Sequence, residues 1–586
     1  MSTTPSDPDD RIHFVKRHQG PNVLPNFYFF SRLVRLAYKP QLIAVVDLTF
    51  GYTASYAQLL TDVLNFRNVL RSRLSPSVVA KLDRDEEVYI NLLGSAGYEF
   101  TVAFLALMAL GAATVPISPD LPVKEAAYFA EKSRAAAVIT AKRSIPLAQS
   151  LEKWMQSSGH SQYQSIEVTP HIMRPCLDPD KFIISSDPYL DLNKSGLVIF
   201  TSGTTGPPKG AVKRRGFLID VALSFGDQHG IQQGDVVLHM LPVHHATGIT
   251  VTLLPFLWFG GQIEFRSGSF DVPWTWERIR KGGLTYFSGV PTIYMRMMAY
   301  YEQRLAKLPQ DQLKSYVSGV NEFRAMLCGT SALPRPLQSK WTKLRNGRPI
   351  LTRYGGTEFA NGFTVTPWAR GVPDGSVGER APGTDLYLTN GDEGEIMSRS
   401  PIMFSKYLFD REATKKSMDE NGYFKTGDIA RREGKYYFIL GRASIDIIKS
   451  GGYKLSALDI EREILGLDYV SEVMVVGVED EEFGQRVAAA IVLKPEVRLR
   501  QQGTVAERAD FNQQKVLKTL SLEKLRTDLK DSLAGYKTPT LLRVVDELRK
   551  NATGKVIKKV LVKELFPPEG HPDIQMWTSQ KQRSKL

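Results

Sequence analysis

Between residues 43 and 140, two kinds of hydrophobic pattern alternate along the chain. Short apolar runs predict strands, and longer runs with an apolar residue every three or four positions predict helices. The predicted strands are 43–48, 88–93, 115–117 and 136–140, and the predicted helices are 56–73, 98–110 and 125–132. Strands that alternate with helices predict parallel sheets covered by helices, and therefore an α/β fold.

The longest apolar run, 101–115, is too short to span a bilayer and is followed by turn residues. We expect a buried helix and then a strand here, and no transmembrane segment. Residues 141–195 are less regular and are expected to cross the surface. Later runs predict strands at 235–241, 436–440 and 470–478 and a helix at 455–465. The polar, highly charged insertion 494–522 has no assigned function.

Composition narrows the class of protein. The chain has 586 residues and is 42% hydrophobic, which is enough for a large core but too long for one compact unit, so two or more domains are expected. The formal charge of +13 would suit nucleic acid, a membrane surface or acidic small molecules, and composition alone does not choose. Because no basic stripe interleaved with aromatic residues occurs, no nucleic-acid partner is expected.

Two features bear on the cellular compartment. Cys176 and Cys328 are too few and too scattered for a disulfide framework or a zinc site, which suits a reducing interior, and the polar N-terminus does not resemble a secretory signal. Ser584, Lys585 and Leu586 stand behind a basic tail. A C-terminal Ser-Lys-Leu is a peroxisomal address read by an import receptor, so we expect a peroxisomal location.

The stretch 198–210 contains the strongest chemical signal. A short apolar strand leads into a loop of hydroxyls, glycines and one lysine, namely Thr201, Ser202, Gly203, Thr204, Thr205, Gly206, Lys209 and Gly210. Glycines let backbone N–H groups approach an anion, so the loop suits a polyphosphate. The spacing differs from that of a P-loop NTPase, which disfavours that class. The alternative is a flexible Ser/Thr/Gly linker.

This loop resembles the phosphate-binding signature of the adenylate-forming superfamily, which includes acyl-CoA synthetases, and further segments carry the same resemblance. It implies that Tyr354 stacks on adenine, Thr357 meets the α-phosphate and Glu358 holds Mg²⁺. It also implies that Asp428 binds the ribose and that Lys555 is the catalytic lysine. The nucleotide site would further include Gly329, Thr330, Ser331, Gly355, Gly356 and Arg442.

The resemblance also implies the domain plan and the remaining ligands. We expect a large N-terminal domain of helix-covered sheets with a distorted barrel, and a small mobile α+β domain. The expected bounds are 1–25 for a flexible N-terminus, 26–441 for the large domain, 442–446 for the hinge, 447–566 for the small domain and 567–586 for the tail. Gly451, Gly452 and Tyr453 would line the tunnel for CoA.

The implied reaction activates a carboxylic acid. The acid attacks the α-phosphate of ATP to give an acyl adenylate and pyrophosphate, and the CoA thiol then displaces AMP. Because the first step brings two anions together, the site must supply positive charge, through Mg²⁺ on Glu358 and through Lys209 and Lys555. Pocket positions would be His245, Thr247, Arg353 and Gly356. The adjacent His244 and His245 are expected to point to opposite sides, which makes a poor metal pair.

Arg353 bears on the choice of acid. Malonyl-CoA and methylmalonyl-CoA synthetases carry Arg at this position, where a guanidinium can pair with a second carboxylate. Thr247 stands where those enzymes have His, and Gly356 replaces the usual Met, which is expected to enlarge the pocket. A specialised or longer acid of a peroxisomal pathway therefore stays open. In the structural alternative, Arg353 merely pairs with an acid such as Asp385.

Three rival functions remain. An acyl-AMP ligase would load a carrier protein instead of CoA, although no carrier-like domain follows Lys555. A non-catalytic binding protein would be expected to have lost catalytic positions, yet all are intact in the sequence. A nucleic-acid binder would show strongly salt-dependent affinity and no pyrophosphate release.

Overall fold

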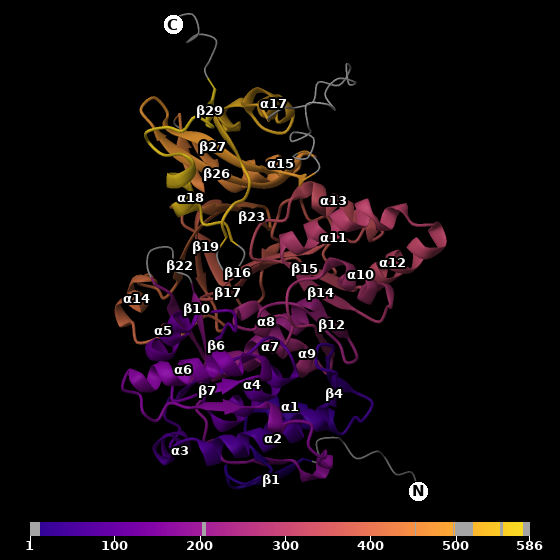
Figure 1. Cartoon of the computed structure of the whole chain (residues 1–586), viewed down its shortest axis with the longest axis vertical. Helices are drawn as coiled ribbons and strands as arrows, with labels where there is room; N and C mark the ends of the chain where they lie inside the picture. The colour runs from indigo at the N-terminus through magenta and orange to yellow at the C-terminus, as the bar shows by residue number, and fades with distance from the viewer. Residues whose placement is uncertain are drawn as a thin grey trace, which may run out of the picture.

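The computed structural model describes residues 12–201, 207–451, 453–495, 497, 520–550 and 555–577. Within these ranges the strands form five sheets. Figure 1 shows a large body built from the N-terminal and central elements and a smaller body of C-terminal elements that caps one end of it. The architecture is therefore mixed α/β with a large and a small part, as predicted.

Two large sheets form the bulk of the molecule. The seven-stranded sheet runs in the order β21 (Lys406–Tyr407), β11 (Lys209–Arg214), β10 (Ser195–Thr201), β6 (Ala113–Ile117), β5 (Tyr89–Leu93), β7 (Val138–Thr140) and β8 (Ser165–Glu167). The nine-stranded sheet runs in the order β18 (Glu379–Arg380), β17 (Ala360–Thr364), β16 (Leu351–Gly356), β15 (Ala325–Cys328), β14 (Tyr286–Gly289), β12 (Val236–His239), β13 (Gln262–Phe265), β3 (Ile43–Asp47) and β4 (Tyr52–Ser55).

Both sheets have a parallel centre and antiparallel edges. Strands β6, β5, β7 and β8 pair in parallel, while β10 and β11 form an antiparallel hairpin. Every residue of β5 and β6 is buried, as expected for strands covered on both faces. The parallel sheets predicted from the alternating pattern are therefore confirmed.

Helices cover these sheets on both sides. Their bounds are α1 Tyr28–Ala37, α2 Tyr56–Arg73, α3 Pro76–Asp83, α4 Tyr98–Leu110, α5 Val123–Ser133, α6 Ile145–Ser157, α7 Arg215–His229, α8 Ala246–Thr250, α9 Leu254–Phe259, α10 Val272–Arg280, α11 Pro291–Gln303, α12 Gln310–Glu322, α13 Arg335–Leu344 and α14 Arg411–Lys416. The predicted bounds of α2 and α4 are confirmed, and every residue of α4 is buried.

The segment 141–195 is more regular than predicted. It contains α6 and the strands β8 and β9 (Ile183–Ser185). Three buried side chains of α6, Ala148, Leu151 and Met155, lie on one face of the helix and pack into a core cluster. Their i, i+3, i+7 spacing is that of an amphipathic helix, so the sequence carried a signal for α6 that the expectation for 141–195 did not use.

A four-stranded antiparallel sheet adjoins the large sheets. Its order is β19 (Asp385–Leu388), β20 (Glu393–Arg399), β22 (Phe424–Glu433) and β23 (Tyr436–Arg442). Tyr437 in β23 exchanges backbone hydrogen bonds with Val377 and Gly378, which lie just before β18, at 2.9 and 3.0 Å. These bonds join the small sheet to the edge of the nine-stranded sheet, where the resemblance predicted a distorted barrel.

The smaller body is built on a six-stranded sheet. The order is β25 (Tyr453–Ser456), β24 (Ile447–Ser450), β27 (Gly484–Leu493), β28 (Leu541–Val545) and β29 (Gln575–Met576), and β26 (Val470–Asp480) pairs with β27. Helices α15 (Ala457–Ile464), α17 (Leu522–Asp528) and α18 (Lys558–Leu565) accompany it. The insertion predicted at 494–522 lies mostly outside the described residues.

Both ends of the described chain are more structured than expected. Strands β1 (His13–Val15) and β2 (Val23–Leu24) flank β9 in a three-stranded sheet, and Leu24 is fully buried, so residues 13–15 and 23–24 of the expected flexible segment 1–25 are part of a sheet. At the other end, β29 joins the small sheet, so residues 575–576 are not part of a free tail. Ser584, Lys585 and Leu586 lie outside the described residues.

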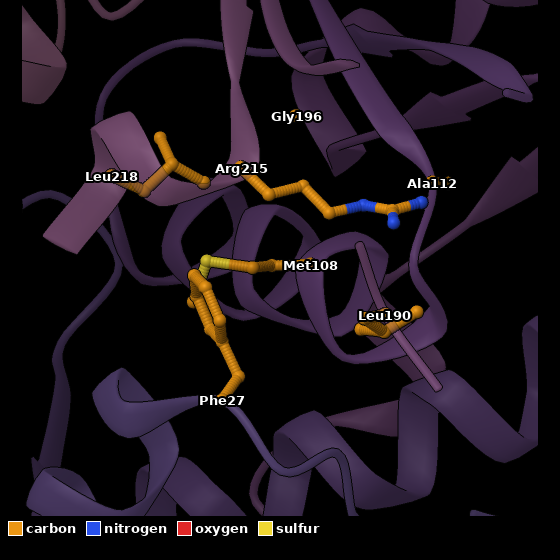
Figure 2. Close-up of a pocket in the computed structure, with 7 residues that line it drawn as sticks. All are labelled: Phe27, Met108, Ala112, Leu190, Gly196, Arg215 and Leu218. Carbon is orange, nitrogen blue, oxygen red and sulfur yellow. The ribbon is translucent and has the colours of Figure 1, made fainter. Parts of the chain in front are cut away.

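A cavity of about 10 Å³ lies between α4 and α7, and Figure 2 shows the Arg215 side chain extended across it toward Ala112. The buried guanidinium donates to the Gly111 carbonyl at 2.6 Å and pairs with Asp85 at 2.5 Å. This volume is room for about one water molecule. The cavity is thus a packing feature stabilised by Arg215, and it is remote from the predicted chemistry.

In the described part of the chain, no helix is both long and apolar enough to cross a bilayer. Both cysteines are free: Cys176 is exposed and Cys328 is buried in the core.

Candidate active site

The predicted phosphate loop connects β10 and β11. Thr201 ends β10 and pairs in register with Lys209, the first residue of β11. The Lys209 ammonium lies 5.3 Å from the centre of the Tyr407 ring. Ser202, Gly203, Thr204, Thr205 and Gly206 lie outside the described residues, so their predicted role stays a prediction.

Glu358 lies in the turn between β16 and β17, next to Thr357. Its Oε1 accepts hydrogen bonds from the Tyr407 hydroxyl at 3.0 Å and from the Thr201 hydroxyl at 3.2 Å. The structure thus brings the end of the phosphate-loop strand and the predicted magnesium residue together, although 157 positions separate Thr201 from Glu358.

Lys213 contacts the backbone of this turn, and the sequence did not predict it as a site residue. Its side chain is almost fully buried, and its ammonium donates to the backbone carbonyls of Glu358 and Ile402 at 3.4 and 3.3 Å. Burial lowers the pKa of Lys213 to about 7. Lys213 stands in a run of basic residues, 213–215, so no sequence signal marked it as a buried residue.

The predicted adenine and ribose residues form a connected group. The Tyr354 hydroxyl donates to Asp428 Oδ2 at 2.6 Å, and Arg442 Nε pairs with Asp428 Oδ1 at 3.0 Å. Asp428 and Arg442 are register partners in β22 and β23. Burial raises the pKa of the Asp428 carboxyl, against the opposing effects of Arg442 and Tyr354.

Lys555 reaches the same site from the smaller body. Solvent still contacts its side chain, but the surrounding protein removes enough solvation to lower the pKa of its ammonium. The charge of Arg442 lowers that pKa further, while Asp428 and Glu358 act in the opposite direction. The predicted catalytic lysine therefore lies within electrostatic range of both predicted acidic residues. Residues 551–554 lie outside the described chain.

Arg353 lies in β16. Among the described residues its buried Nε has no hydrogen-bond partner, and its guanidinium makes no ion pair. The guanidinium carbon lies 5.9 Å from the centre of the Phe225 ring. Burial lowers the pKa of Arg353 to about 10, so the group is still cationic at neutral pH.

The alternative that Arg353 pairs with Asp385 is wrong. Asp385 is exposed on β19, where it pairs with Arg399 at 2.9 Å and accepts a hydrogen bond from Tyr423 at 2.5 Å. The carboxylate is thereby already satisfied by neighbours on its own sheet and the adjoining turn.

His245 lies at the start of α8, next to Thr247. The rings of His244 and His245 are 4.4 Å apart, so the expectation that they point to opposite sides is wrong, because residues 242–245 form a turn instead of an extended strand. The Nε2 of His245 is buried and has no hydrogen-bond partner in the described part of the chain. Burial, followed by the nearby charge of Lys555, lowers the pKa of His245 to about 4.

Two glycine-containing segments lie beside these side chains. Gly329 follows β15 closely enough to Arg353 that a Cβ there would lie 3.2 Å from the Arg353 Cγ, and Thr330 has a φ of +72° before Ser331. A Cβ on Gly356 would lie 2.4 Å from the Phe359 ring. Phe359 thus lies where a side chain at position 356 would begin, and the expected enlargement of the pocket stays a prediction.

The predicted CoA turn connects β24 and β25. Gly451 has a φ of +55°, and its N–H donates to the Phe483 carbonyl at 2.9 Å. Tyr453 stacks on Tyr536 with ring centres 4.4 Å apart, and both rings are about half exposed. Gly452 lies outside the described residues. These contacts of Gly451 and Tyr453 are made with Phe483 and Tyr536 of the smaller body.

The donor set suits a hard cation bound with a polyphosphate. Among the described residues no cluster of three or more His, Cys, Asp or Glu could hold a metal by itself. Glu358 offers one carboxylate, with Oε1 oriented by two hydroxyls, and Mg²⁺ is commonly held by one or two carboxylates together with substrate phosphates. Glu358 therefore fits Mg²⁺ that arrives with ATP.

Comparison with known proteins agrees with this geometry. Residues 34–408 match the model of the AMP-binding enzyme family, and residues 459–555 match that of the AMP-binding enzyme C-terminal domain. A CoA ligase of Gibberella moniliformis is 32% identical, over 92% of this chain and 94% of its own. The mitochondrial malonate–CoA ligase ACSF3 of Bos taurus is 31% identical, over 87% of each chain.

Solved structures share the fold. ATP-bound MatB from Rhodopseudomonas palustris superposes with a TM-score of 0.71 at 23% identity, over 94% of this chain and all of that chain. The o-succinylbenzoate CoA synthetase MenE of Bacillus subtilis, bound to its acyl-adenylate intermediate, gives 0.69 at 24% identity, over 91% and 97%.

These matches and the connected nucleotide-type site define an adenylate-forming enzyme, and the chain belongs to the AMP-binding enzyme family. Within that family it is an acid–thiol ligase of the AMP-forming type, which makes an acyl-CoA through an acyl adenylate.

Proposed function

We propose that this ligase activates a short dicarboxylic acid such as malonate or methylmalonate. The guanidinium of Arg353 supports this proposal, because it is largely buried and makes no ion pair in the described part of the chain. A buried cation without a counter-charge is costly, and a second carboxylate on the substrate would supply that charge through a bidentate pair. The malonate–CoA ligases among the relatives agree with this choice of acid.

In the proposed first step, the reacting carboxylate attacks the α-phosphorus of ATP. One acid oxygen forms a bond to phosphorus, the bond to the bridging oxygen breaks, and pyrophosphate leaves with the electron pair. Lys209 stabilises the phosphate charge, and Lys555 neutralises the approaching carboxylate and the α-phosphate oxygens. Asp428 holds the ribose hydroxyls and Tyr354 the adenine, which fixes the α-phosphate for in-line attack.

Glu358 would hold Mg²⁺ in this site. When bound, Mg²⁺ acts as a Lewis acid that neutralises charge on the phosphate oxygens. The hydroxyls of Thr201 and Tyr407 orient the Glu358 carboxylate. The Lys213 ammonium and the Phe404 N–H both donate to the Glu358 backbone carbonyl.

In the proposed second step, the small domain rotates about the hinge 442–446. This movement withdraws Lys555 and brings Gly451, Gly452 and Tyr453 to the site, where the CoA thiol attacks the acyl carbon and AMP leaves. Rotation suits two reactions that need different groups at one site.

A screen of mono- and dicarboxylic acids for acid-dependent pyrophosphate release tests the choice of substrate. We expect malonate or methylmalonate to be turned over fastest, and Arg353→Gly to lower kcat/KM for dicarboxylic acids about tenfold or more, with little effect on monocarboxylic acids. Arg399→Gly removes an exposed arginine of the same region and is the matched control. Equal loss on both classes of acid would contradict the role of Arg353.

The same screen separates the open alternatives. Thr247, in place of a second histidine, leaves room for a specialised or longer acid, and preferential turnover of such an acid would favour that alternative. An acyl-AMP ligase would release pyrophosphate but form no thioester with free CoA, whereas a carrier protein would accept the acyl group.

The role of Lys555 is tested by Lys555→Ala. Because each charge that stabilises the transition state contributes about 3 kcal/mol, acyl-adenylate formation is expected to fall at least hundreds-fold, which single-turnover quenching would measure. Formation of the acyl adenylate at the wild-type rate would refute the mechanism.

We also propose import into the peroxisome through Ser584, Lys585 and Leu586, which act as an address where Leu586 is the C-terminal residue. A fluorescent protein fused to the N-terminus should mark peroxisomes, and deletion of these three residues should disperse it. Unchanged localisation after the deletion would refute this proposal.

A further inference from the structure

A buried cation joins the hinge to the segment that carries Lys555. Lys558, the first residue of α18, donates to Asp446 Oδ1 at 2.6 Å, to Glu461 Oε1 at 2.7 Å and to the Val475 carbonyl at 3.2 Å. An ammonium has three donors, and all three are used here. Lys558 stands three residues after Lys555, and Asp446 is the last residue of the predicted hinge.

All three charged side chains are largely removed from solvent, with 12–14% exposure. Burial raises the pKa of Glu461, while the two carboxylates raise the pKa of Lys558 and keep its ammonium protonated. Removal of the ammonium would leave two carboxylates close together in a poorly solvated place. Breaking such a network from one side is far costlier than losing a surface pair.

Asp446 and Glu461 are each fixed to the small domain by one further hydrogen bond. The Asp446 backbone carbonyl accepts the N–H of Ala457, which begins α15, at 2.7 Å, and Glu461 on the same helix accepts the Val475 N–H at 2.7 Å. Toward the large domain, Asp446 contacts only the hinge itself in the described hydrogen bonds, through the Arg442 N–H at 3.0 Å and the Arg442 carbonyl at 2.8 Å.

We propose that Lys558 is a positioning residue that ties the Lys555 segment to Asp446, so that the catalytic lysine and the end of the hinge move as one unit. The pivot is then confined to Ala443–Ile445, of which Ala443 and Ser444 are exposed. This inference rests on the proposed function, because it assigns Lys555 to the adenylation step and withdraws it for the thioester step.

The test measures the two half-reactions separately. Adenylation is followed as acyl-adenylate formation without CoA, and thioester formation starts from CoA and the synthetic adenylate of the acid selected by the screen, with malonyl adenylate as the first probe. Lys558→Met should slow adenylation about tenfold or more and leave thioester formation within about twofold of wild type, since a displaced lysine matters only in the first step. Lys558→Arg should restore most of the adenylation rate.

Lys563→Met is the matched control, because Lys563 is an exposed lysine on the same helix. If Lys558→Met does not fold, Asp446→Asn replaces it in the test. This variant weakens the contact between Lys558 and the hinge, yet it leaves Glu461 to neutralise Lys558. We expect the same split at about threefold. Equal loss in both half-reactions, or no loss, would overturn the inference. Absence of acid-dependent pyrophosphate release by the wild type would instead refute the proposed function.

Discussion

Three buried nitrogen atoms near the predicted acid pocket have no hydrogen-bond partner among the described residues. They are Arg353 Nε, His229 Nε2 and His245 Nε2. His229 stacks on Phe225 with ring centres 4.1 Å apart, and Arg353 lies over the same Phe225 ring. Under the proposed function, the polar groups of a dicarboxylic acid could supply partners for nitrogens of this kind.

At the residue scale we predict a pH dependence of stability from His239, which is fully buried. Its ring nitrogens contact the Leu241 carbonyl and the Thr252 hydroxyl, and burial lowers its pKa from 6.5 to about 4. Below pH 6.5 the unfolded chain gains a proton that the folded protein does not, so the free energy of unfolding falls until about pH 4. The loss approaches about 3 kcal/mol.

Urea midpoints near neutral pH and at about pH 5 measure this effect. His239→Gln should reduce the difference between the two midpoints, whereas His160→Gln, at an exposed position, should not. Identical pH dependence in wild type and His239→Gln would assign the acid sensitivity to other groups.

At the scale of elements, strand β11 places two lysine side chains on one side of the site. Lys209 and Lys213 are four residues apart in a strand, so their side chains point to the same face. Lys209 lies beside Tyr407 at the predicted phosphate site, and the Lys213 ammonium donates to the backbone carbonyl of Glu358. One strand therefore couples the phosphate loop to the predicted magnesium residue.

The β16–β17 hairpin carries Tyr354 and Glu358, and Gly355 has no room for a side chain. A Cβ at Gly355 would lie 2.0 Å from the Ala360 carbonyl oxygen across the hairpin. Gly355→Ala should therefore lower the free energy of unfolding by about 1–3 kcal/mol and weaken ATP binding, because the hairpin must shift. Denaturant titration and ATP calorimetry measure the two effects. Gly535→Ala, where no atom lies within 4 Å, is the control, and equal behaviour of both variants would contradict the prediction.

At the scale of the whole molecule, contacts on α15 beside the hinge join the small part to the large part. Arg335 on α13 lies 3.9 Å from Glu463 on α15, and the Ser456 hydroxyl at the start of α15 donates to the Leu440 carbonyl at 2.5 Å. An exposed ion pair of the length of Arg335–Glu463 contributes less than about 1 kcal/mol. Its loss would therefore oppose the proposed rotation of the small domain only slightly.

The third prediction concerns ligand linkage. At an ATP concentration 100-fold above its Kd, the free energy of unfolding should rise by about 2.7 kcal/mol, which appears as a higher melting temperature. Lys555→Ala should keep most of this shift, since Asp428, Tyr354 and Lys209 still hold the nucleotide, but it should lose any further shift produced by acid and ATP together. A variant that loses the ATP shift as well would place Lys555 in ground-state binding.

The sequence alone determined the elements whose periodicity is strong and local. Local sequence patterns specified α2 and α4 to the residue, because both segments are longer than a typical strand and the almost wholly apolar run of α4 suits a helix that is buried on all sides. The family was also readable, since the glycine-rich loop and the stretch around Glu358 keep their chemistry in short strings. The amphipathic spacing of α6 was readable in the same way but was not used, whereas the two-residue strand β29 is too short to carry a pattern and is decided by its pairing with β28.

Only the tertiary structure decided which groups meet. The contacts of Thr201 with Glu358, of Tyr354 with Asp428 and of Lys558 with Asp446 join residues far apart in the chain, and no periodicity encodes such pairs. The turn at His244 and the Phe359 ring beside Gly356 likewise arise from the path of neighbouring segments. Motif chemistry is local in the sequence, whereas distances and burial depend on how the whole chain packs.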